Sequence, residues 1–176
     1  RLCSSAASDV YKRQISISAM KTVKLVLLIS FLFISNSFSD EIKSWEMLRE
    51  GGKVIFIRHS YAPGTGDPKN FKLYDCSTQR NLNKQGIDQS IRMGKLFSDY
   101  SIPIDSVYSS QWCRCEDTAR LAFGNFENFN ALNSTFSGNY QENHSKQMSE
   151  LHQFIQGWDD GQGNLIFVTH YVIVGG

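Results

Sequence analysis

Two histidines in this chain each follow a short run of apolar residues. Arg58 and His59 come directly after Val54-Ile55-Phe56-Ile57, and His170 follows the run over 164–169. Such runs predict strands that are buried on both faces, as in a parallel sheet. Because ligands bind at the carboxyl ends of parallel strands, we expect both histidines to face one pocket.

A second arginine lies between the two histidines in the sequence. The run over 106–110 predicts a third short strand, and the helix expected after it, over 112–123, places Arg114 in its first turn. The N-terminal end of a helix favours anions, because its backbone N–H groups are free and its dipole is positive there. Guanidinium groups such as Arg58 and Arg114 bind phosphate bidentately, and a neutral imidazole can attack phosphorus. These residue types therefore predict phosphoryl-transfer chemistry.

Four ordered motifs resemble those of a known family. They are Arg58-His59, the segment over 80–89 (Arg-x-Leu-x-x-x-Gly-x-x-Gln), the segment over 109–119 (Ser-Ser-x-x-x-Arg-x-x-x-Thr-Ala) and Thr169-His170. In order and spacing over residues 53–170, the chain resembles the histidine phosphatase superfamily, which has the phosphoglycerate-mutase-like fold.

The resemblance implies a fold and a set of roles. The fold is an α/β class, a three-layer α/β/α sandwich with a mostly parallel sheet, which agrees with the alternation of predicted strands and helices. His59 is the expected nucleophile and His170 stabilises the transferring group, while Arg58 and Arg114 bind the phosphate. The implied activity is that of a compact phosphatase that hydrolyses a small phosphorylated substrate through a phosphohistidine, without a metal or other cofactor.

Two further residues are candidates for binding the substrate. The loop over 62–68 is rich in Gly and Pro, and Thr65 is a candidate neighbour of the phosphate, although an ordinary connecting loop explains it equally well. Ser60 stands where the family has glycine. Its hydroxyl either is accommodated by the pocket or donates a hydrogen bond to the substrate.

The family's usual general acid is missing from its expected place. Many members carry a glutamate after a Leu-x pair, but this chain reads Leu132-Asn133-Ser134, and a serine hydroxyl is a poor acid. Glu142 is a possible general acid nearby, although a solvated glutamate at a helix start is the commoner case. The departure favours substrates with good leaving groups, such as phosphohistidine. The alternative is a catalytically silent phosphate-binding domain of the same fold.

The first 39 residues differ from the rest. Residues 1–19 read as a non-native or upstream-leader-like segment, and 20–39 as a signal peptide with Lys21 and Lys24 before an apolar run over 25–34. We expect an exported protein, periplasmic or secreted. Stable membrane insertion is not expected after cleavage, because the run is short for a bilayer, and an uncleaved anchor is the alternative.

The domain over 40–176 is expected to be incomplete at its C-terminus, since the resemblance implies further elements after His170.

Charge and cysteines limit the partners. Residues 40–176 contain 13 Lys and Arg against 16 Asp and Glu, so we expect a small phosphorylated ligand and no nucleic acid. In an exported protein, Cys76 can form a disulfide with Cys113 or Cys115, and simple buried thiols are the alternative. The helix expected over 84–99 is predicted to bury Ile87, Ile91, Gly94 and either Leu96 or Phe97.

Overall fold

The computed structural model describes residues 43–136, 138–159 and 161–175. The segments expected to be a leader (1–19) and a signal peptide (20–39) lie outside these ranges. The chain divides into two compact units, Arg1–Ser44 and Trp45–Gly176, and nearly all described residues belong to the second. No helix within the described ranges is both long and apolar enough to cross a bilayer.

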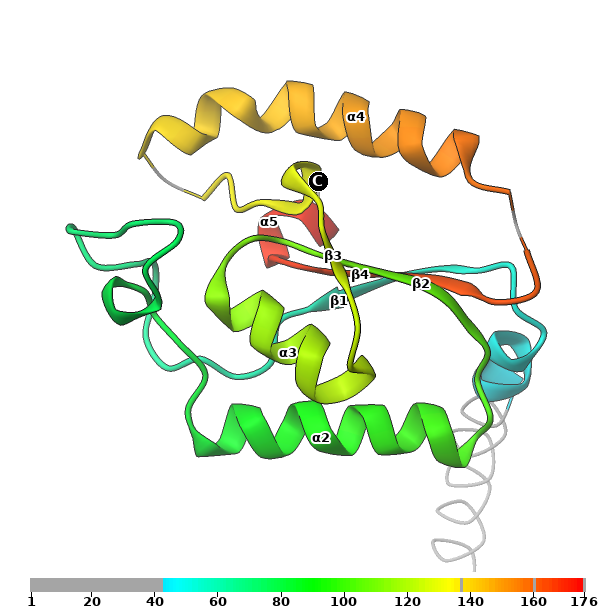
Figure 1. The fold of residues 1–176 in the computed structure, drawn as a ribbon. Coiled ribbons are helices and arrows are strands. Elements are labelled where there is room, and N and C mark those ends of the chain that lie inside the picture. Colours follow the sequence, from blue (N-terminus) through cyan, green and yellow to red (C-terminus); the bar gives the residue numbers. More distant parts are fainter. Residues whose placement is uncertain (1–42, 137, 160, 176) are drawn as a thin grey trace, which may run out of the picture. The chain divides into compact units, whose positions relative to one another are not determined.

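Four parallel strands form the centre of the second unit. In spatial order they are β1 (Val54–Arg58), β4 (Asn164–Thr169), β2 (Ile104–Ser109) and β3 (Glu127–Asn128) (Figure 1). Arg58 at the end of β1 pairs with Thr169 at the end of β4. The predicted parallel sheet is confirmed, and its register brings the residues that follow β1 and β4 to the same edge.

Helices cover both faces of the sheet (Figure 1). They are α2 (Lys84–Asp99), α3 (Cys113–Phe123), α4 (His144–Gly157) and α5 (Tyr171–Val174), with the 3-10 helices η1 (Cys76–Thr78), η2 (Asn130–Leu132) and η3 (Gly138–Asn143). Residues 43–49 are also helical. The α/β class and the three layers expected from the sequence are therefore confirmed.

The central strand β4 separates two apolar cores, because successive side chains of a strand point to opposite faces. Ile166 and Val168 pack in the cluster that contains Phe97 of α2, and Leu165 and Phe167 pack in the cluster that contains Leu151 of α4. All six residues of β4 are buried. Each such apolar side chain stabilises the fold by about 1.5–3 kcal/mol, so the strand that ends at the second histidine is held rigidly.

The buried face of α2 differs from the prediction. Ile87 and Ile91 are 39% and 50% exposed, whereas Phe97 is buried as predicted, together with Gly86 and Ser90. A Cβ atom at Gly86 would lie 2.1 Å from the carbonyl oxygen of Tyr61, so only glycine allows this approach of helix to backbone. The expectation was wrong for the two isoleucines, because close backbone packing placed small residues inward at this end of the helix.

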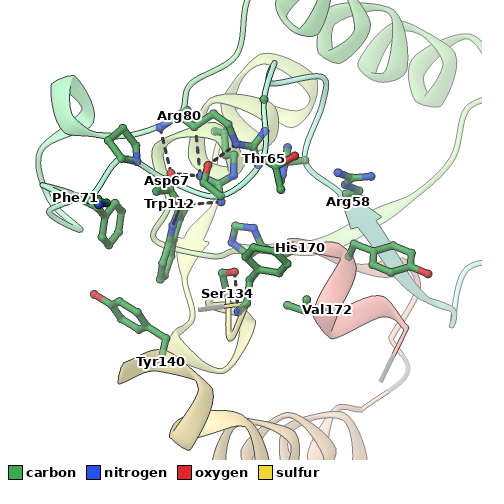
Figure 2. A pocket seen from close by; sticks show the side chains of 18 residues that line it. Arg58, Thr65, Asp67, Phe71, Arg80, Trp112, Ser134, Tyr140, His170 and Val172 are labelled. Carbon is green, nitrogen blue, oxygen red and sulfur yellow. Dashed lines mark hydrogen bonds and ion pairs between the residues drawn. The ribbon is translucent and has the colours of Figure 1, made fainter. Parts of the chain in front are cut away.

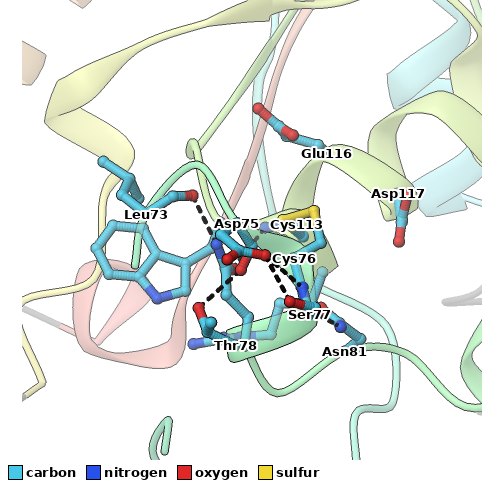
Figure 3. Close-up of a disulfide and its surroundings, with 12 residues drawn as sticks. Leu73, Asp75, Cys76, Ser77, Thr78, Asn81, Cys113, Glu116 and Asp117 are labelled. Atoms are coloured by element: carbon cyan, nitrogen blue, oxygen red, sulfur yellow. Dashed lines mark hydrogen bonds between the residues drawn. A yellow bond between two sulfur atoms is a disulfide. The ribbon is translucent and has the colours of Figure 1, made fainter. Parts of the chain in front are cut away.

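A disulfide joins Cys76 of η1 to Cys113, the first residue of α3 (Figure 3). Cys115 is a buried free thiol, and burial raises its pKa to about 12. Gln79 adds a second link between the same elements, because its Oε1 accepts a hydrogen bond from the backbone N–H of Cys113 at 3.0 Å. The loop before α2 is thus fastened to the start of α3.

Removal of this disulfide is expected to destabilise the domain. The bridge closes a loop with a sequence separation of 37, which corresponds to about 4 kcal/mol of unfolded-state entropy. The Cys76→Ser/Cys113→Ser variant should lose about that much free energy of unfolding in urea titrations. Dithiothreitol should destabilise the wild type and leave the double variant unchanged; equal sensitivity of the two proteins to the reductant would contradict the assignment.

Candidate active site

A cavity of about 750 Å³ opens at the edge of the sheet where β1 and β4 end (Figure 2). It is lined by polar and charged residues together with several aromatic rings. The lining residues are Arg58, His59, Gly64, Thr65, Gly66, Asp67, Pro68, Lys69, Phe71, Arg80, Trp112, Arg114, Ser134, Phe136, Tyr140, His170, Tyr171 and Val172. The four residues predicted to do the chemistry, two histidines and two arginines, all belong to this set.

The two histidines face each other from neighbouring strands. His59 follows β1 and His170 follows β4, and the backbone N–H of His59 donates to the carbonyl of Thr169 at 2.9 Å. Their ring centroids are 5.5 Å apart. Both side chains are buried except where they meet the cavity. Two imidazoles from distant parts of the chain therefore form one pair.

His59 is held as a neutral ring with one free nitrogen. Its Nδ1 lies 2.8 Å from the carbonyl oxygen of Ser60, which can only accept, so Nδ1 carries the proton. The lone pair is then on Nε2. Burial lowers the pKa of His59 from 6.5 to about 4, and the charges of Arg114, Arg80 and Arg58 add to this effect. At neutral pH the ring is therefore unprotonated, as an attack on phosphorus would require.

A chain of hydrogen bonds determines which nitrogen of His170 is protonated. Oδ1 of Asn133 accepts from the backbone N–H of Gln111 at 2.9 Å and from Ser110 Oγ at 3.1 Å. The hydroxyl proton of Ser110 is therefore directed to Asn133. With its own proton on Asn133, Oγ of Ser110, 2.9 Å from Nε2 of His170, accepts the hydrogen bond of that nitrogen, which also lies 3.5 Å from Sγ of Cys115.

The opposite nitrogen of His170 is available to a ligand. Nδ1 has no hydrogen-bond partner among the described residues, and it carries the lone pair of the neutral ring. Burial lowers the pKa of His170 well below its usual value, and the nearby charge of Arg114 adds to this. The ring is therefore neutral at neutral pH, and its Nδ1 lone pair can accept a hydrogen bond.

A buried ion pair fixes the second arginine. Arg114 is 3% exposed, and its Nη1 and Nη2 lie 2.8 and 3.2 Å from the two carboxylate oxygens of Asp67. The indole N–H of Trp112 and the backbone N–H of Arg80 also donate to that carboxylate, each at 3.0 Å. Partial burial raises the pKa of Asp67, but the hydrogen bonds from Arg114, Arg80 and Trp112 outweigh it and leave the pKa lowered. Asp67 is therefore an anion, and Nε of Arg114 is buried without a partner among the described residues.

Two more guanidinium groups line the cavity. Nε of Arg80 donates to the carbonyl of Gly66 at 2.8 Å, and Nη1 donates to that of Ala62, which fastens the loop after β1. Arg58 is exposed at the end of β1, with its Cζ 6.0 Å from the ring centroid of Tyr171. Three guanidinium groups thus share the lining with the single carboxylate of Asp67. The excess of positive charge suits a phosphate dianion.

The other candidates occupy different places. Thr65 lines the cavity. Ser60 is buried outside the lining, where its Oγ bonds with Ser90 of α2 at 2.7 Å. Glu142 is exposed in η3 and does not line the cavity, whereas Ser134 does. No group of three or more His, Cys, Asp or Glu side chains within the described ranges is arranged to hold a metal ion.

Several lining residues were not singled out from the sequence. Arg80 was visible only as part of the motif over 80–89, and the sequence offered no signal for Asp67, Trp112 or Tyr140. Their place in the site follows from hydrogen bonds and ring contacts between segments far apart in the chain.

Comparisons with known proteins identify the family of the chain. The model of the histidine phosphatase superfamily (branch 1) matches residues 54–167. Similar solved structures include SixA from Agrobacterium tumefaciens, with 17% identity and a TM-score of 0.46 over 68% of this chain and 70% of that one. The product of the open reading frame Rv3214 from Mycobacterium tuberculosis has 18% identity and a TM-score of 0.48 (66% and 72% covered), and the alpha-ribazole phosphatase from Shigella flexneri has 17% and 0.45 (69% and 75%). No curated protein matches the chain.

The lowered pKa of His59 predicts a pH-dependent stability. Above pH 6.5 the ring is neutral in the folded and unfolded chain. Between pH 6.5 and about 4 only the unfolded chain takes up the proton. Lowering the pH over this range therefore lowers the free energy of unfolding, by about 3 kcal/mol for this residue. In urea titrations over this pH range, His59→Gln should lose less free energy of unfolding than the wild type, by that amount. The exposed His152→Gln should behave as wild type; a His59→Gln variant with the wild-type slope would refute the burial argument.

The chain from Asn133 predicts the tautomer of His170. In Asn133→Ala the hydroxyl of Ser110 loses its acceptor and becomes free to donate to Nε2, so the ring proton should move to Nδ1. Nitrogen-15 NMR of histidine-labelled protein should show a protonated Nε2 of His170 in wild type and an unprotonated one in the variant. Asn130→Ala, an exposed neighbour on η2, is the matched control. A wild-type spectrum with Nδ1 protonated would contradict the assignment.

Proposed function

Since the chain belongs to the histidine phosphatase superfamily, we propose that it hydrolyses a small phosphorylated substrate through a phosphohistidine at His59. The observation that carries this proposal is the neutral His59 ring, whose Nδ1–H is bound by Ser60 and whose free Nε2 faces a cavity with three guanidinium groups. Phosphoryl transfer requires little more than such positioning and positive charge.

In the first step, Nε2 of His59 attacks phosphorus while Arg58, Arg80 and Arg114 bind the phosphoryl oxygens. An N–P bond forms, the bond from phosphorus to the leaving group breaks, and the electron pair departs with the leaving group. The Nδ1–H of His59 stays bound to the carbonyl of Ser60, which stabilises the positive charge that the ring acquires.

In the second step, water attacks the phosphorylated ring. Nδ1 of His170 accepts a proton from that water, the new P–O bond forms, and the N–P electron pair returns to Nε2 of His59. Phosphate leaves, and the proton on His170 passes to solvent. The tautomer imposed by Ser110 and Asn133 supports this role, because it leaves Nδ1 of His170 unprotonated.

The substrate has a leaving group that departs without help from an acid. Asp67 is the carboxylate among the lining residues, and its lowered pKa keeps it ionised. Ser134 lines the cavity where the family's acid is expected, and Glu142 is exposed outside it. Phosphohistidine and aryl or acyl phosphates meet this requirement, since their leaving groups are weak bases.

The reaction is proposed to need no metal, because the guanidinium groups supply the positive charge. The protein is proposed to be exported by means of the segment over 20–39 and to act in a periplasmic or extracellular space. The Cys76–Cys113 disulfide supports this location, since disulfides persist in oxidising compartments.

The proposal is tested by trapping the intermediate. Rapid acid quench of the wild type with p-nitrophenyl phosphate, followed by mass spectrometry, should place a phosphoryl group on His59. His59→Ala should lose the adduct and at least about 10³-fold in kcat, as expected for loss of a nucleophile. His152→Ala is the control, and EDTA should leave the rate unchanged. Phosphate binding without turnover in the wild type would favour the silent domain instead.

A further inference from the structure

The cavity is much larger than a phosphoryl group. Pockets of about 300–1,000 Å³ bind ligands of drug size, and this one has about 750 Å³. The phosphoryl group, held between the histidines and the guanidinium groups, would fill only one part. The remainder must accommodate the group to which phosphorus is attached.

Three aromatic rings form one side of that remaining space, which we call the aromatic wall: Phe71, Trp112 and Tyr140. Phe71 and Trp112 are stacked, with centroids 5.2 Å apart and an interplanar angle of 16°. Tyr140 meets both rings edge on, at 5.2 Å from Trp112 and 6.0 Å from Phe71. The indole N–H of Trp112 is bound to Asp67, so the wall is held in place.

The aromatic wall begins at the reacting centre. The ring of Trp112 lies 5.4 Å from that of His170, edge on. Figure 2 shows Phe71, Trp112 and Tyr140 together on one side of His170, with Arg58 on the other. A leaving group attached to a phosphoryl group at His59 can therefore extend along the rings.

Other apolar groups complete this part of the cavity. Phe136 lines it and is 50% exposed, and Val172 and Pro68 also line it. A concave site lined by several apolar and aromatic side chains is typical of small-molecule pockets. The positive charges of Arg58, Arg80 and Arg114 supply the contrasting polar end.

We propose that the substrate carries its phosphoryl group on an aromatic ring, and that this ring binds against the aromatic wall. The inference rests on the proposed function, because it takes the phosphoryl group to lie at His59. An aryl phosphate fits the wall and the missing acid: its ring can pack against Phe71 and Tyr140, the partly exposed rings of the wall, and its aryloxide leaves without a protein acid. The P–O bond of the ester breaks and the aryloxide departs with the electron pair, as in the first step above.

Phosphonates that cannot be hydrolysed test the aromatic wall directly. Calorimetry on the full chain should give benzylphosphonate a Kd about tenfold lower than methylphosphonate, as expected for one well-packed ring. In Tyr140→Ala this ratio should fall to about two, with the Kd of methylphosphonate unchanged. Tyr140→Leu is the second variant if Tyr140→Ala does not fold. The control is Tyr74→Ala, which removes an 83% exposed tyrosine outside this cavity and should keep the full ratio.

Equal affinities for the two phosphonates would overturn the inference, as would a ratio unaffected in both Tyr140 variants. Turnover of phenyl phosphate and of acetyl phosphate, which has no ring, separates this inference from the proposed function. Hydrolysis of both without a preference for benzylphosphonate refutes the aromatic wall and leaves the phosphatase standing. Tighter binding of benzylphosphonate with no hydrolysis of either refutes the phosphatase and leaves the ring-binding site standing.

Discussion

The buried ion pair between Asp67 and Arg114 is the interaction on which the site depends. It joins the loop after β1 to the first turn of α3, and the same carboxylate also accepts hydrogen bonds from Arg80 and Trp112. A buried guanidinium group without a counter-ion is costly, by about 3–5 kcal/mol when one partner of such a pair is removed. Asp67 allows Arg114 to remain charged inside the protein, beside the histidine pair.

The features that we propose to bind phosphate also keep the proposed nucleophile, His59, unprotonated. Burial disfavours the imidazolium form of His59, and the charges of Arg114, Arg80 and Arg58 act in the same direction. Because these guanidinium groups remain protonated, the cavity is positive while its two imidazoles are neutral. Such a cavity attracts a dianion, and the lone pair of the proposed nucleophile is available at neutral pH.

The residues that hydrogen-bond to the two histidines, and those that hydrogen-bond to them in turn, explain how the rings are oriented. Ser60 directs one ring through its backbone carbonyl, while its hydroxyl turns to Ser90, so the departure from glycine does not place a new group in the cavity. Ser110 and Asn133 direct the other ring. The two rings, which line the same cavity, therefore leave different nitrogens unprotonated, Nε2 of His59 and Nδ1 of His170.

The sequence by itself determined the parallel sheet and the meeting of His59 with His170, because buried apolar runs and the register of parallel strands depend on local pattern. Tertiary structure alone decided the inner face of α2, where Gly86 packs against the backbone of Tyr61. It also decided that Cys76 pairs with Cys113, because residues two apart on a helix point to nearly opposite sides and Cys115 faces Thr169 instead. The ion pair of Asp67 and the aromatic wall arise in the same way, since contacts between distant segments leave no periodic trace in the sequence.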